Sequence, residues 1–350
     1  MRNSKKLIVD GFRIAMAYIG TVIGAGFATG QEILQFFTRY GYSSFWAILI
    51  SVALFVIVGR SILFYGRELR AKSYGSLIDH VFGISAPLVN LYLAVAYILL
   101  CGAMFAGAGA LFEEQWGLHY MIGASVTALL TLIVTLRGVK GVLAINTLIV
   151  PCLVIFSVSV FVFALNRSNM PVIVMQPVKF GEALSLINTG VTYASFNLVL
   201  SIGVLAPLGG EIQDKKALSL GSLLGGSILG LLLIIGNYGL LANVPEVLHW
   251  EIPQMVIVNK MGGLFVTLFT LVIWAEIFTT AVGNLFAIHT VAKEKYKAES
   301  ILPAIAGTVL GLAICLLGFS NIVSWFYPIL GIIGFALCII ILVRTFRSES

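Results

Sequence analysis

Several stretches of the chain run far longer without a charged residue than a water-exposed surface allows. Residues 301–343 form 43 consecutive positions without Asp, Glu, Lys or Arg, and 183–210 and 217–243 are similar. A helix crosses a bilayer with about 20 apolar residues. With 59% hydrophobic and 10% charged residues overall, the sequence predicts an all-α polytopic membrane protein. This excludes soluble enzymes, secreted disulfide scaffolds and nucleic-acid binders, and we expect no cofactor.

The apolar runs divide into ten predicted spans within one membrane domain, 1–350. The run 301–343 is about twice the length of one span, and the turn expected at 318–321 divides it. The predicted halves of the domain are 1–165 and 180–345. The expected spans are 12–37, 43–65, 87–111, 119–136, 141–164, 183–208, 217–243, 263–290, 301–318 and 320–343.

Lys and Arg concentrate in alternate loops. If the amino terminus is inside, the inner segments hold 17 of these residues and the outer segments hold 4. An excess of basic residues marks the cytoplasmic side of a membrane protein. We therefore expect a protein of the cytoplasmic membrane with both termini in the cytoplasm.

The first span contains four glycines within eleven residues, at 20, 24, 26 and 30. Each glycine costs a helix interior about 1 kcal/mol relative to alanine. Close helix packing would explain small residues at every fourth position, as at 20, 24 and 28, but not Gly26 or Gly30. Nor would it explain the polar residues that follow. An interruption near Gly24 to Gly26 explains both, and unwound backbone at membrane depth must line a cavity or be buried in protein.

The sixth span carries a polar patch at 188–197, followed by apolar residues up to 208. Ten spans divide into five plus five, and because five is odd the second half would have inverted topology. Interrupted segments at corresponding places in two inverted halves point to the binding site of a secondary transporter. We therefore predict that spans one and six are both broken.

Two strings carry a resemblance to a known family: Gly-Ala-Gly-Phe-Ala-Thr-Gly-Gln-Glu at 24–32 and Leu-Ala-Pro-Leu-Gly-Gly-Glu-Ile at 205–212. They are similar to the bacterial YkvI-like membrane proteins of the amino acid–polyamine–cation superfamily. The resemblance covers essentially the whole chain. It implies a LeuT-type five-plus-five inverted repeat and transport, most often of amino acids.

A broken helix exposes backbone amides that attract an anion and backbone carbonyls that attract a cation. A zwitterion such as an amino acid suits two such helices. We expect its carboxylate at the amides of Gly24, Ala25 and Gly26. Candidate groups for its ammonium and side chain are Tyr193, Ser195 and Asn197, with Tyr97 and Phe105 as further walls.

The resemblance also implies a sodium site. Sodium-coupled relatives use two adjacent hydroxyl residues of span eight and carbonyls of the broken first span, which correspond here to Thr279, Thr280, Gly20 and Ile23. The alternative is that the threonines bond back to their own helix. Proton-coupled relatives place a lysine of span five at this position, and residues 141–165 contain none, which favours sodium.

Two carboxylates, Glu276 and Glu32, fall within spans and are candidates for coupling. An ionisable residue inside the membrane is a functional-site hypothesis by default. Glu276 shares a helical face with Thr279 and Thr280, so it would either carry a proton or compensate a cation. For Glu32 the favoured interpretation is a hydrated carboxylate in an outer vestibule.

The sequence therefore predicts a symporter for a small zwitterionic solute, driven by sodium or protons and working by alternating access. The alternative is a membrane nutrient sensor on the same fold that binds without net transport. Short loops and the lack of a soluble partner domain weigh against the sensor. An intramembrane enzyme is disfavoured, because no HExxH motif or serine–histidine dyad is found in the spans.

Overall fold

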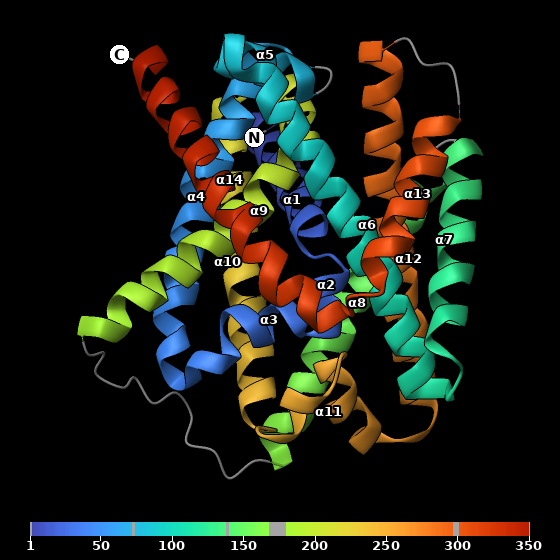
Figure 1. Ribbon diagram of the computed structural model, residues 1–350. Helices are drawn as coiled ribbons and strands as arrows, with labels where there is room; N and C mark the ends of the chain where they lie inside the picture. Colours follow the sequence, from blue (N-terminus) through green and yellow to red (C-terminus); the bar gives the residue numbers. More distant parts are fainter. Residues whose placement is uncertain (1, 72–73, 138–139, 168–179, 297–300, 350) are drawn as a thin grey trace.

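The computed structural model describes residues 2–71, 74–137, 140–167, 180–296 and 301–349, and every regular element in that part is a helix (Figure 1). Short 3-10 segments lie at Thr38–Ser43, Gly83–Ser85 and Glu246–His249. The α-helices are α1 (Arg2–Val22), α2 (Ala25–Thr29), α3 (Gln31–Phe36), α4 (Ser44–Glu68), α5 (Tyr74–Phe82), α6 (Ala86–Trp116), α7 (Tyr120–Arg137), α8 (Lys140–Arg167), α9 (Phe180–Glu211), α10 (Lys215–Leu241), α11 (Pro253–Met261), α12 (Gly263–Tyr296), α13 (Leu302–Cys315) and α14 (Phe319–Glu349).

The helices match the predicted pattern of membrane spans. Among the described residues, seven helical segments are long and apolar enough to cross a bilayer, and α13 and part of α8 are shorter apolar helices. The remaining predicted span corresponds to α1, α2 and α3 together. A turn divides the last two spans as expected, but at 316–318 instead of 318–321: α13 ends at Cys315, α14 begins at Phe319, and Gly318 has φ 84°. The structure is compatible with ten spans.

Both chain ends lie at one end of the bundle, with α11 at the opposite end (Figure 1). This agrees with an even number of crossings, although the assignment of that end to the cytoplasm stays a prediction. The residues that join the halves in sequence, 168–179, lie outside the described residues.

The α4 and α9 helices touch at their backbones. A β-carbon at Gly66 of α4 would overlap the Ala206 carbonyl, and one at Gly209 of α9 would overlap the Leu63 carbonyl. Membrane helices lack a hydrophobic force that drives them together in lipid, so small residues that admit close packing matter most. The second string of the family resemblance thus includes a helix-packing residue, Gly209.

The predicted interruption of the first span is confirmed. Helix α1 ends at Val22 and α2 begins at Ala25, with Gly24 extended at φ −109° and ψ −170°. A second interruption follows at Gly30, whose φ of 82° lies in the left-handed region that glycine adopts without strain. A β-carbon at Gly30 would also press on the Gln254 side chain at 2.8 Å.

The predicted break in the sixth span is wrong, because α9 runs as one helix from Phe180 to Glu211. Its polar residues serve other purposes. Asn197 Nδ2 donates to the Tyr193 carbonyl at 3.1 Å and Ser201 Oγ donates to the Asn197 carbonyl at 2.6 Å, both within the helix. A β-carbon at Gly190 would overlap the Ala47 carbonyl of α4. Gly190 therefore admits a neighbouring helix, and the polar side chains bond within α9 without interrupting it.

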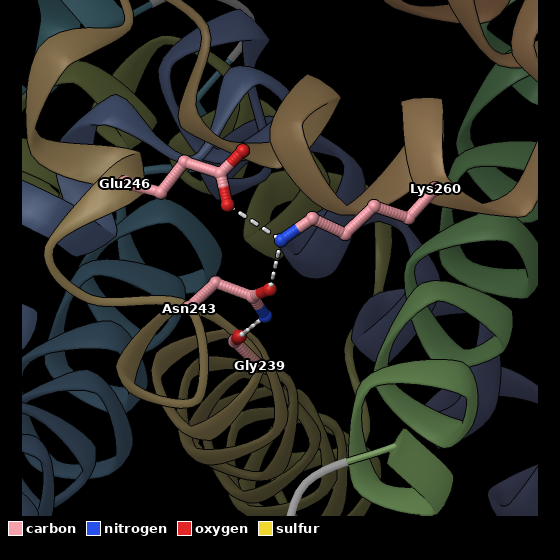
Figure 2. Close-up of polar contacts among 4 residues, drawn as sticks. All are labelled: Gly239, Asn243, Glu246 and Lys260. Carbon is pink, nitrogen blue, oxygen red and sulfur yellow. Dashed lines mark hydrogen bonds and ion pairs between the residues drawn. The ribbon is translucent and has the colours of Figure 1, made fainter.

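At the end of the bundle opposite the chain termini, a polar cluster holds the segment between α10 and α12 in place (Figure 2). Lys260 Nζ donates to Glu246 Oε2 at 2.6 Å and to Asn243 Oδ1 at 3.0 Å, and Asn243 Nδ2 donates to the Gly239 carbonyl at 3.0 Å. The cluster ties the end of α11 to the end of α10. It thereby fixes α11, whose Gln254 is buried against the broken first span.

Candidate functional site

The break between α1 and α2 leaves peptide groups without helical partners. The helical ladder resumes when the amides of Phe27 and Ala28 donate to the Gly24 carbonyl, at 3.1 and 3.0 Å. Among the described residues, the amides of residues 24–26 donate no backbone hydrogen bond, and the carbonyls of Gly20 and Ile23 accept none. These are the groups from which the sequence predicted the anion and cation sites.

Helix α12 brings Thr280 to this break. A β-carbon at Gly24 would lie 3.7 Å from Thr280 Oγ1, so the hydroxyl lies directly beside the interruption. The neighbouring Thr279 is buried, and its hydroxyl donates to the Glu276 carbonyl at 3.2 Å. Of the two threonines, Thr280 is therefore the one that lies at the break. Thr279 instead bonds back to its own helix, which was the alternative to a role in a sodium site.

Glu276 lies one turn before Thr280 on α12. Its side chain is 2% exposed, and its Oε2 has no hydrogen-bond partner among the described residues. A buried carboxylate without a partner is costly unless it is neutralised. Glu276 thus lies where a residue that couples ion binding to transport could act, and this role stays a prediction.

Glu32 is not a hydrated vestibule carboxylate, because its side chain is 6% exposed. The turn at Gly30 directs α3 back over α2, so that a β-carbon at Gly26 would overlap the Glu32 carboxyl group. The sequence placed Glu32 two straight turns beyond the break and missed this reversal. The carboxylate therefore lies against the interrupted segment itself.

Two tyrosines lie on the helices around the Glu32 carboxylate. The Tyr193 hydroxyl of α9 is next to the carboxylate, and Tyr327 of α14 lies within range of its charge. Neither meets hydrogen-bond geometry there, and both hydroxyls and Glu32 Oε2 are buried without a partner in the described part of the chain. The Tyr193 ring packs on Phe36 and Phe37, with centroids 5.3 and 4.9 Å apart.

Not every predicted wall residue joins this cluster. Ser195 is buried against α14, since a β-carbon at Gly334 would lie 3.1 Å from the Ser195 carbonyl. The Tyr97 hydroxyl lies near Gly203 of α9, ten residues and about 15 Å of helix from Tyr193. Phe105 packs against Gly311 of α13. Asn197 bonds within α9, as described above.

Three residues that sequence reasoning did not single out join the site. Gln254 Nε2 donates to the Phe27 carbonyl at 3.4 Å, and Gln31 Nε2 donates to Ser320 Oγ at 2.5 Å. Tyr327 is the third. In the sequence, Tyr327 is indicated only weakly, as a lone tyrosine beside a proline in a charge-free run. No local feature of the sequence indicates that Gln254 is a site residue.

A polar network continues from Gln31 through Ser320 and Glu251 to Glu114. Both the amide and the hydroxyl of Ser320 donate to Glu251 Oε2, at 2.6 and 2.9 Å, at the start of α14. The Glu251 amide donates to Glu114 Oε1 at 2.8 Å. These bonds connect α3, α14, the segment before α11 and the end of α6.

A cavity of about 250 Å³ lies between α3, α9 and α14. Phe36, which packs on the Tyr193 ring, forms one wall of it. The other lining residues are Gln35, Arg39, Tyr40, Asn188, Thr189, Thr192, Ser324 and Pro328. The Phe36 side chain thus separates the cavity from the Glu32 cluster, and Thr280 is not among the residues that line the cavity.

Comparisons with known proteins agree with this architecture. The chain is 32% identical over 329 residues to the membrane protein YkvI of Bacillus subtilis (strain 168), covering 93% of each chain. No protein-family model matches. MhsT in complex with L-phenylalanine has a TM-score of 0.66 at 15% identity, covering 96% of this chain and 98% of that one.

A substrate-bound, outward-open Na⁺-coupled sialic acid symporter has a TM-score of 0.60 at 10% identity, with coverage of 93% and 76%. At such identities the two structures show the fold alone. The resemblance of the strings at 24–32 and 205–212 to YkvI-like proteins is confirmed by the 32% identity to YkvI. The chain is therefore a membrane protein of the YkvI family with the LeuT-type fold.

Proposed function

We propose that this protein is a secondary active transporter that carries a small solute with an ammonium group across the cytoplasmic membrane by alternating access. The observation that carries the proposal is the interrupted first span, whose unbonded peptide groups lie beside Thr280 of α12. Peptide groups at membrane depth need a partner. In secondary transporters, discontinuous helices of this kind hold solutes and coupling ions.

The proposed coupling ion is sodium or a proton. The carbonyls of Gly20 and Ile23 and the hydroxyl of Thr280 supply oxygen ligands, which suit a small hard cation. Glu276, one turn away, would compensate that ion or carry a proton in its place. Ion binding at the break would favour the geometry that binds the solute, and this coupling is reciprocal by thermodynamic linkage.

An amino acid is one solute of the proposed class. Its carboxylate would bind at the amides of Gly24, Ala25 and Gly26, the first peptide groups after the break. The L-phenylalanine bound to MhsT and the sodium coupling of the sialic acid symporter are in line with such a function. Both termini are proposed to be cytoplasmic, on the strength of the 17 basic residues in inner segments.

Thr280→Ala tests the coupling proposal. Removing the hydroxyl should abolish the sodium dependence of uptake in proteoliposomes, because one of the few oxygen ligands at the break is lost. Uptake of labelled L-phenylalanine and labelled phenylethylamine, each with and without a sodium gradient, is the measurement. The matched control is Thr270→Ala on the same helix, whose hydroxyl donates to the Val266 carbonyl at 2.8 Å. Sodium dependence that survives in Thr280→Ala and equals that of the control would remove the sodium assignment.

Counterflow separates transport from sensing. Vesicles preloaded with an unlabelled solute that binds should take up the labelled solute, because a transporter exchanges it across the membrane. A sensor on the same fold would bind the solute and show no exchange. Binding without counterflow would therefore overturn the transporter proposal.

A further inference from the structure

Glu32 occupies the position beside the break where a solute carboxylate was expected. Gly26 has no β-carbon, and this admits the Glu32 carboxyl group directly against the backbone of the interrupted segment. A solute carboxylate at the same peptide groups would face this built-in carboxylate at short range. Two like charges in a buried site disfavour one another, so the site as built favours a solute that brings no carboxylate.

Among the described residues no buried Lys, Arg or His pairs with Glu32, and Arg39, which lines the neighbouring cavity, is exposed. Within the described ranges, the buried charged side chains are Glu32 and Glu276, and none is Lys, Arg or His. An isolated buried carboxylate is strongly disfavoured unless it is paired or neutralised. Either a proton or a cation from outside the protein would balance the Glu32 charge, and a solute ammonium group is such a cation.

The surroundings of Glu32 suit an organic cation. The Tyr193 hydroxyl lies next to the carboxylate, the Tyr327 hydroxyl lies within range of its charge, and neither hydroxyl has a hydrogen-bond partner by geometry in the described part of the chain. Phe36 and Phe37 flank the Tyr193 ring, and Phe196 stacks on the Tyr327 ring at 4.4 Å between centroids. Aromatic faces attract ammonium groups, and oxygen atoms accept their hydrogen bonds. A carboxylate among aromatic rings combines both interactions.

We propose that Glu32, with the Tyr193 and Tyr327 hydroxyls, binds the ammonium group of the transported solute, and that this solute is a small primary amine without a carboxylate. The inference rests on the proposed transport function and narrows its substrate class. The neighbouring cavity of about 250 Å³ offers room for the body of such a solute. It is slightly smaller than the roughly 300–1,000 Å³ of pockets for drug-sized ligands, which is in keeping with a small molecule.

Matched pairs of ligands test the substrate class on the purified full-length protein. Phenylethylamine is compared with L-phenylalanine, and 3-methylbutylamine with L-leucine, by thermal shift and by equilibrium binding. Because a ligand that binds the folded form raises its melting temperature, the amines should stabilise the protein. They should bind at least about tenfold more tightly than the amino acids. Equal or tighter binding of the amino acids, or no binding of either amine, would overturn the proposal.

Glu32→Gln tests the residue assignment, because it keeps the shape of the side chain and removes its charge. Hydrogen bonds to charged groups correspond to about 10- to 100-fold in affinity, and amine binding should weaken by that factor. Glu68→Gln, at an exposed carboxylate near the end of α4, is the control and should bind amines normally. Unchanged amine affinity in Glu32→Gln would contradict the assignment.

Two further variants keep the test decisive if Glu32→Gln does not fold. Tyr193→Phe and Tyr327→Phe retain the rings and remove the hydroxyls, and each should weaken amine binding while leaving the melting temperature of the free protein nearly unchanged. Unaltered amine affinity in both would overturn the proposal. If the amino acids show counterflow and the amines do not, the protein is a transporter but its solute is not an amine. If the amines bind without counterflow, the amine site is supported and the transporter proposal is refuted.

Discussion

Gly209→Ala is expected to remove most of the folded protein from the membrane. The added methyl group would point into the Leu63 carbonyl of α4, and a β-carbon at Gly66 would meet the Ala206 carbonyl of α9. Backbone cannot rotate away as a side chain can, so the two helices must separate. Overpacking costs about 1–3 kcal/mol or more. That exceeds the gain of about 1 kcal/mol from replacing glycine by alanine in a helix.

The measurements for Gly209→Ala are the yield of monodisperse protein and its melting temperature. Gly283→Ala is the matched control, because Gly283 lies within α12 and a β-carbon there meets no atom within 4 Å. The control should fold at least as well as the unaltered protein. A Gly209→Ala variant as abundant and as stable as the control would show that α4 and α9 do not touch as described.

Gly26→Ala is expected to fold but to lose solute binding and uptake by at least about tenfold. The new methyl group would displace the Glu32 carboxyl group, which is the end of a flexible side chain and can move. Moving it costs the fold little but removes the carboxylate from Tyr193 and Tyr327. The loss corresponds to one charge-assisted hydrogen bond or more. Binding of phenylethylamine, uptake in proteoliposomes and the melting temperature are the measurements.

A second substitution checks the cause of the Gly26→Ala defect. Glu32→Asp shortens the side chain by one methylene group, so the double variant should recover part of the binding that Gly26→Ala loses. Such non-additivity is the signature of two residues in direct contact. Normal binding in Gly26→Ala, or strictly additive losses in the double variant, would contradict the contact between residues 26 and 32.

Much of the site could not be read from the sequence, because the same local signal has two structural meanings. Glycine beside polar residues marks an interruption at Gly24, where the peptide groups lack helical bonds, and marks close packing at Gly190, where α4 approaches α9. Helix propensity is nearly equal in the two cases. The difference lies in which helix is the neighbour.

The burial of Glu32 has the same origin. Its depth depends on the left-handed turn at Gly30, and that turn is held where Gln254 of α11 packs against it. Gln254 lies more than two hundred residues away in sequence, so no window of local sequence contains the interaction. Tyr327 joins the cluster for a similar reason, through the packing of α14 on α9.

Hydropathy and the missing β-carbon of glycine are local properties of the chain, and they were enough to predict the membrane class, the approximate positions of the spans and the break near Gly24. The continuity of α9, the contact of Glu32 with Gly26 and the approach of Thr280 to the break became visible in the folded chain alone. A buried polar group takes its role from its partners, and here those partners come from distant helices.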